Sequence, residues 1–235
     1  MQSVRTGRAR TDSPDRTAQR AEARPAAQVA ADAVGDRHAP VRPTLRVATA
    51  AAHHALDHHP LLRRLTASDL TREQYADALA AMHRPHAQLE RLVHGSRHHA
   101  ESGLNLGPRL DLLEADLREL RRPVPAAPRL LDAGSDDRAA WWGRVYVLEG
   151  SRLGGAFIAT RVRSSLGTTV PSRFFAAAMA SDAPAAMQAM RARELADPVE
   201  LKRALASAVA AFAAYQAGLD ASTQERTALA AGAAA

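Results

Sequence analysis

The chain has 235 residues, of which 46% are hydrophobic and 4% aromatic, and its formal net charge is +6. The absence of cysteine excludes disulfides, thiolate ligands to haem or zinc, and cysteine-held iron–sulfur clusters. We find no run of 18 apolar residues and no apolar secretory segment, and therefore expect a cytoplasmic protein without a membrane span. The basic charge comes without a nucleic-acid-binding motif or stacking aromatics, which favours an acidic small ligand or protein partner over nucleic acid.

Residues 1–40 mix Arg, Asp, Ala, Ser and Pro without periodicity, which predicts a disordered tail. Apolar residues then recur at helical spacing from Leu45 to Leu56, after Thr44 as the expected N-cap. Thr71 and Gln74 form a capping-box pattern ahead of a second helix.

Further helical patterns follow at 110–120, from about 136 through the glycine-rich stretch, at 172–180, at 183–195 and at 198–219. No stretch alternates as a strand would. The sequence therefore predicts an all-α, single-domain helical bundle over 41–220, with 221–235 as a frayed C-terminal tail.

The stretch VYVLEGSRLGGAFI, residues 145–158, determines the functional interpretation. It does not spell G-x-G-x-x-G and no second strand accompanies it, so a nucleotide-binding strand is excluded in favour of a helix. Gly150, Gly154 and Gly155 together disfavour that helix by roughly 2–3 kcal/mol. Either close packing against another helix or a flat ligand against the bared backbone can offset this, and both interpretations stay open.

His53 lies at the edge of the apolar stripe of the first helix. Asp57, one turn later, could accept its second ring proton and fix the tautomer that a metal ligand needs. Arg46 stands two turns earlier, about 10.5 Å away at 1.5 Å per residue. A ligand and a cation so spaced could serve the iron and a carboxylate edge of one planar cofactor. A core histidine with a surface arginine is the alternative.

Three segments, LRVATAAAHHALD, LTREQYADALAAMHRPHAQLE and YVLEGSRLGG, resemble the haem oxygenases in order and spacing. The resemblance covers about residues 45–220 and extends especially to the bacterial, biliverdin-producing branch associated with bacteriophytochromes. It implies an all-α fold that holds haem between a proximal and a kinked distal helix.

On the proximal side, the resemblance implies that His53 ligates the iron and that Thr49, one turn earlier, lies beside the cofactor. Arg46 falls where the family places a base that pairs with a propionate. Arg191, in the segment MRAREL, is a second propionate candidate, and a surface charge is the alternative for it.

On the distal side, the resemblance implies that the three glycines leave room for dioxygen at the iron. Ser151 stands where the better-known branch has an aspartate that orders water for proton delivery. A hydroxyl can hold a water but carries no charge, so we expect a variant solution here. Glu149 and Arg152 are further candidates for this network, with solvent-facing helix charges as the alternative.

The activity that this implies is the opening of haem to biliverdin, ferrous iron and carbon monoxide. Its electrons would come from a separate ferredoxin or flavoprotein reductase, and a bacteriophytochrome is the expected recipient of biliverdin. A haem-binding or haem-transfer protein without turnover is one alternative, motivated by Ser151. A non-haem metal site is another, and its candidate ligands are His53, His54, His58, His59, His83, His86 and Glu90.

Overall fold

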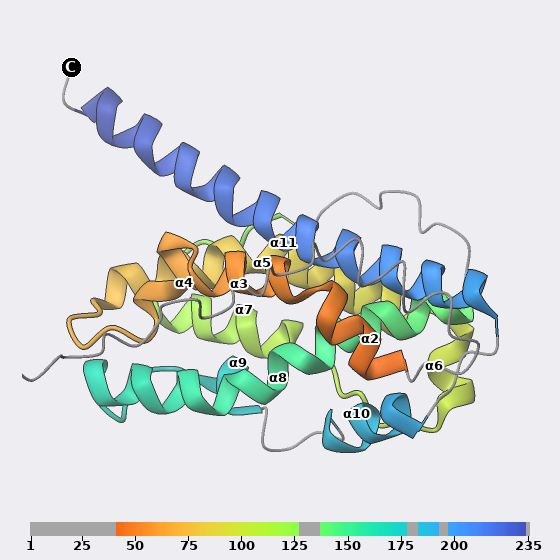
Figure 1. Cartoon of the computed structure of the whole chain (residues 1–235). Helices are drawn as coiled ribbons and strands as arrows, with labels where there is room; N and C mark the ends of the chain where they lie inside the picture. Colours follow the sequence, from red (N-terminus) through yellow and green to blue (C-terminus); the bar gives the residue numbers. More distant parts are fainter. Residues whose placement is uncertain (1–40, 127–136, 178–182, 193–196, 234–235) are drawn as a thin grey trace, which may run out of the picture.

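The computed structural model describes residues 41–126, 137–177, 183–192 and 197–233, and within these ranges every regular element is a helix (Figure 1). The helices are α2 (Val41–Ala48), α3 (Ala50–Asp57), α4 (Pro60–Arg64), α5 (Arg72–His94), α6 (Arg97–Ser102), α7 (Leu110–Glu119), α8 (Arg138–Leu166), α9 (Arg173–Ala176), α10 (Ala183–Ala192) and α11 (Pro198–Ala233). The all-α prediction is confirmed. The predicted disordered tail, residues 1–40, lies outside the described residues.

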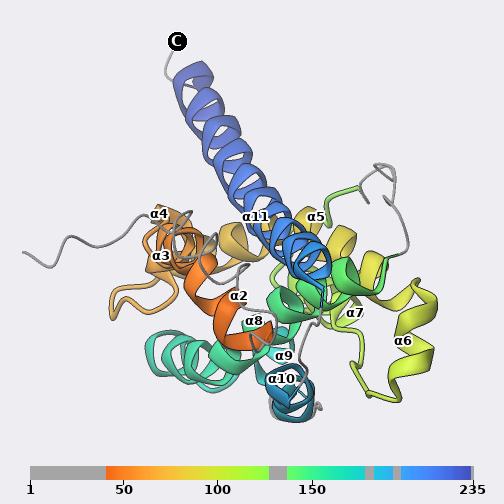
Figure 2. The same ribbon diagram turned by 45° about the vertical axis from the view of Figure 1, so that its right-hand side comes forward.

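The helix α8 is the centre of the bundle, and α5, α9, α10 and α11 pack against it (Figures 1 and 2). None of residues 139–149, in its first half, is exposed. The indole N–H of Trp141, which is 1% exposed, donates to the carbonyl of Val93 in α5 at 3.0 Å. The glycine-rich stretch continues this helix without interruption, so the helical interpretation of residues 145–158 is confirmed.

Close approach between α8 and α11 depends on Gly143. A Cβ at this position would lie 2.2 Å from the carbonyl oxygen of Ala204, far inside van der Waals contact. Glycine therefore lets the two backbones touch, and α11 can cover the first half of α8. Residue 143 is the helix-packing glycine of α8, which the sequence patterns did not single out.

The segment around Thr44 differs from the expectation of one helix capped by this residue. The helix α2 begins at Val41 and ends at Ala48, and Thr44 lies inside it. The break falls at Thr49, whose backbone (φ −96°, ψ 1°) is not helical, and α3 begins after it. The spacing of about 10.5 Å estimated for Arg46 and His53 assumed a continuous helix, which this break interrupts. The capping box of Thr71 and Gln74 in α5 is confirmed.

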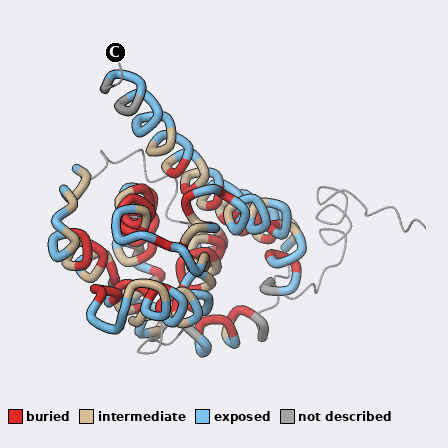
Figure 3. Tube along the Cα trace, turned by 90° about the vertical axis from the view of Figure 1, so that its left-hand side faces the viewer, coloured by how far each residue is buried: buried red, intermediate tan, exposed pale blue. Residues whose placement is uncertain are grey.

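The far end of the chain also differs, because α11 continues as a helix to Ala233 instead of fraying after residue 220. Its last turns project from the body and are exposed (Figures 1 and 3). Arg226 donates to the buried carboxylate of Asp77 in α5 at 2.6 Å. This ion pair links the projecting segment of α11 to α5. Within the described residues, no helix combines the length and hydrophobicity that a membrane crossing requires.

The two kinds of glycine in α8 should respond oppositely to alanine. Gly143→Ala forces α8 and α11 apart and should lower the free energy of unfolding by about 1–3 kcal/mol. Gly150→Ala meets nothing within 4 Å and should raise it by about 0.5–1 kcal/mol, because alanine is the better helix former. Urea unfolding of both variants measures the difference. Equal stability of the two would contradict this account of the α8–α11 contact.

Candidate functional site

From Gly150 onward, one side of α8 becomes exposed, while Ala159 and Val162 on its other side remain in the core. Ser151, Leu153, Gly154 and Phe157 lie on the exposed part, and Leu153 and Phe157 are 50% and 61% exposed. A Cβ at Gly150 or Gly154 would meet nothing within 4 Å. Packing against another helix therefore does not explain these two glycines. We call the exposed side of residues 150–157 the open face. Gly155, the third glycine predicted to lie against the ligand, is buried and is not part of it.

The junction of α2 and α3 is joined to α8 just before the open face. Thr49 is 1% exposed, and its hydroxyl oxygen lies 2.7 Å from the carbonyl oxygen of Leu45 and 3.4 Å from the hydroxyl of Tyr146 in α8. One turn on, the backbone N–H of His53 donates to the carbonyl of Thr49 at 2.9 Å. The Thr49 side chain thus points inward, where it fixes the junction and with it the position of His53.

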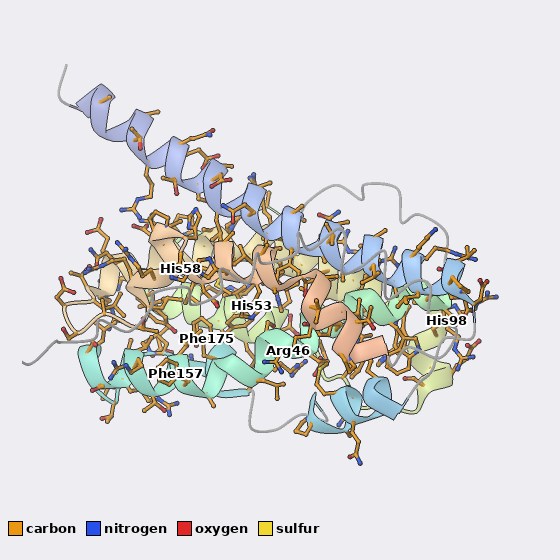
Figure 4. All side chains as sticks on the ribbon, viewed as in Figure 1. Arg46, His53, His58, His98, Phe157 and Phe175 are labelled. Atoms are coloured by element: carbon orange, nitrogen blue, oxygen red, sulfur yellow. The ribbon has the colours of Figure 1, made fainter. Side chains whose placement is uncertain are left out.

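The imidazole of His53 is exposed, which excludes the interpretation as a core histidine. Its Nδ1 lies 2.9 Å from a carboxylate oxygen of Asp57, and both side chains are 61% exposed. This contact holds the proton on Nδ1 and leaves Nε2 as the nitrogen for a ligand. The ring edge rests on Phe212 of α11, with centroids 6.0 Å apart. Arg46 is also exposed, on α2 (Figure 4).

Behind the open face lies a buried arginine that the sequence patterns did not single out. The Arg109 side chain is 1% exposed, and its Nη2 donates to the Ser151 hydroxyl at 2.8 Å and to the Leu148 carbonyl at 3.4 Å. The Ser151 hydroxyl in turn donates to the Leu148 carbonyl at 2.6 Å. The guanidinium also lies over the Phe174 ring, 4.7 Å from its centroid. Ser151 is therefore the point where this buried cation reaches the exposed side of α8.

Glu90 of α5 holds the segment that carries Arg109. Its carboxylate accepts the backbone N–H of Arg109 at 2.5 Å and that of Leu110 at 3.0 Å, and so caps the start of α7. His86, one turn earlier on α5, lies 3.3 Å from the same carboxylate and bonds the Tyr215 hydroxyl through Nδ1 at 2.8 Å.

Arg152 of α8 holds the same segment from the other side. Its guanidinium donates to the carbonyls of Leu106 and Gly107, and its Nε donates to the Glu149 carboxylate at 2.9 Å. Glu149 and Arg152 are 0% and 2% exposed. The interpretation of these two residues as solvent-facing charges is wrong, because both side chains are buried and Arg152 holds the loop at Leu106 and Gly107.

Burial and hydrogen bonding set the charge states of this cluster. Burial acts to raise the pKa of Glu90, but the contacts from His86 and two backbone N–H groups outweigh it and hold that pKa at about 2. Burial lowers the pKa of His86 to about 4 and that of Arg109 to about 10. Burial also raises the pKa of Glu149, against the opposing charge of Arg152. At neutral pH, Glu90 and Arg109 are charged and His86 is neutral.

The histidines proposed for a non-haem metal site are dispersed. His54 and His58 stack on each other at the surface, with centroids 4.0 Å apart. His83 is buried and pairs with Glu114 at 3.1 Å, while His86 and Glu90 are engaged as described above. Among the residues that the structure describes, no three such side chains are grouped to hold a metal ion. Arg191, the second propionate candidate, lies in α10 with its side chain outside the described residues.

A groove of about 380 Å³ lies elsewhere, between α5, α8 and α11. Alanines of α11 form much of its wall, and Leu92, Arg144 and Arg203 contribute to it. None of the predicted site residues lines this groove. The open face and the α2–α3 junction therefore remain the candidate site.

Together these features define an all-helical protein that offers a flat, partly apolar ligand the exposed imidazole of His53 and a helix face on which Gly150 and Gly154 leave the backbone uncovered. The family model described as Heme oxygenase matches residues 40–221, and the chain belongs to that family. A similar protein, named Heme oxygenase, comes from Xanthomonas campestris pv. campestris (strain 8004) and is 44% identical over 62 residues. That alignment covers 26% of this chain and 36% of the relative's length.

Loss of the Glu90 charge should destabilise the protein in a pH-dependent way. The folded-state pKa of Glu90, about 2, lies below the ordinary value of 4.5, so its stabilisation is complete above pH 4.5 and is lost as the pH falls toward 2. Glu90→Gln should lower the free energy of unfolding by about 3 kcal/mol at pH 7 and by clearly less at pH 3. Urea unfolding at both pH values measures this, with Glu73→Gln on the exposed first turn of α5 as control. A loss of equal size at both pH values would refute the capping role.

Proposed function

We propose that the chain is a haem-degrading enzyme that opens haem to biliverdin, ferrous iron and carbon monoxide. The observation that carries this proposal is the empty space beside Gly150 and Gly154, on a helix whose first half is closely packed at Gly143. Glycines within a helix are unfavourable, and no neighbouring side chain or backbone benefits from these two. A flat macrocycle against the open face supplies the missing contact, and membership of the haem oxygenase family supports haem as that ligand.

The residues of the candidate site fit haem in three respects. His53 offers Nε2 to the iron, because Asp57 occupies Nδ1. Leu153 and Phe157 offer exposed apolar surface to the macrocycle. Arg46 on α2 is an exposed cation suited to a propionate, and we retain Arg191 as a second candidate for that role. When bound, haem supplies the iron that activates dioxygen and is itself the molecule that is oxidised.

The protein's own contribution is to hold and orient the substrate. Thr49 anchors the α2–α3 junction to α8, so the distance between His53 and the open face is set by a buried contact instead of by an exposed loop. Electrons would come from a separate ferredoxin or flavoprotein reductase, because the sequence carries no flavin or nicotinamide motif. Membership of the biliverdin-producing, bacteriophytochrome-associated branch is part of the same proposal.

Titration with hemin tests the proposal. The wild type should develop a Soret band, and His53→Ala should weaken hemin binding at least tenfold or shift the band, because the iron loses its protein ligand. His54→Ala is the matched control, since His54 is the neighbouring exposed imidazole and should bind hemin as the wild type does. Addition of reductant in air should then bleach the wild-type band as biliverdin absorption grows.

Three results would contradict the proposal in different ways. No Soret band in the wild type would reject haem as the ligand. A stable Soret band without biliverdin would identify a haem-binding or haem-transfer protein. Equal effects of His53→Ala and His54→Ala would reject His53 as the iron ligand.

A further inference from the structure

The charge of Arg109 lacks a paired carboxylate, although the side chain is buried. Within the described residues, no Asp or Glu oxygen lies in salt-bridge contact with its guanidinium, and its Nε is buried without a hydrogen-bond partner. Its contacts are two neutral oxygens, those of Ser151 and Leu148, and the face of Phe174. A buried unpaired charge is unfavourable, so an anion brought near it is stabilised.

The neighbouring charges do not neutralise this cation by direct contact. The Glu90 carboxylate accepts hydrogen bonds from the backbone N–H groups of Arg109 and Leu110 and does not contact the guanidinium. Glu149 pairs with Arg152. Glu90 and Arg152 together hold the backbone of the loop that carries Arg109. The position of the guanidinium beside Ser151 is therefore fixed by the loop.

The Ser151 hydroxyl lies between this charge and the exterior of the open face. A hydroxyl has one proton and two lone pairs. The Ser151 proton goes to the Leu148 carbonyl, and one lone pair accepts from Arg109. Only one acceptor position is left, on a residue that is exposed. The electrostatic character of this surface is therefore set by the cation behind the hydroxyl, because the hydroxyl itself is neutral.

We propose that Arg109 sets the electrostatic potential at the open face. Its buried positive charge favours anionic oxygen ligands to the iron on this side of the bound haem. This proposal rests on the function proposed above. It assigns to the distal side a fixed cation behind a serine, at the position where the better-known branch of the family has an aspartate. Fixed charges in a water-poor surrounding act strongly on charge that develops nearby.

The test is a spectroscopic pH titration of the ferric haem complex, which follows the ionisation of water to hydroxide at the iron and needs no turnover. Arg109→Gln keeps a hydrogen-bond donor toward Ser151 but removes the charge, and should raise the pKa of this transition by about one unit, a tenfold change. Arg109→Lys keeps the charge and should stay close to the wild type. Arg91→Gln, on the exposed side of α5, is the control for a change in net charge and should also leave the pKa unchanged.

Ser151→Ala makes the test independent of whether the Arg109 variants fold. It removes only the exposed hydroxyl and retains the cation, so its pKa should lie within about 0.3 units of the wild type, a factor of two in the ionisation constant. A shift of one unit in Ser151→Ala, or none in a folded, haem-binding Arg109→Gln, would overturn the assignment to Arg109. Absence of a Soret band in the wild type would instead reject the proposed function.

Discussion

The helix α8 is buried along its first half and open on one side of its second half, and the rest of the structure is arranged around this requirement. The first half achieves burial through Gly143, which lets α11 lie directly against the α8 backbone. The second half has glycines at 150 and 154 with empty space beside them. The same residue type thus serves two opposite purposes within three turns of one helix. Gly143 allows α11 to pack against the α8 backbone, whereas Gly150 and Gly154 leave the α8 backbone uncovered.

The segment between α6 and α7 is held by charged side chains where apolar packing would be the simpler solution. Glu90 fixes backbone N–H groups and Arg152 fixes carbonyls, so both kinds of buried backbone group are satisfied. Buried ion pairs contribute little net stability, but removal of one partner is strongly destabilising. This arrangement therefore specifies one loop conformation at little net stabilisation. The consequence is a guanidinium held at a fixed position behind Ser151.

Periodicity and capping signals were sufficient to predict the longer helices, and α5 begins at its predicted capping box. The short helices α4 and α6 were not predicted. The pairing of His53 with Asp57 was also predictable, because an i, i+4 contact is local. The break at Thr49 was not, since it depends on a contact with Tyr146, 97 residues away. Arg109 gave no signal, because a lone arginine before a helix looks like any surface charge until the fold buries it.

The measurement that tests the central claim most directly compares apoprotein stability with hemin affinity in Gly154→Leu. Because a Cβ at 154 meets nothing within 4 Å and leucine is a better helix former than glycine, the apoprotein should be as stable as the wild type or more so. The leucine would occupy the space assigned to the macrocycle, so hemin affinity should fall at least tenfold. Stability that drops while hemin affinity is retained would contradict the account and return this glycine to a purely structural role.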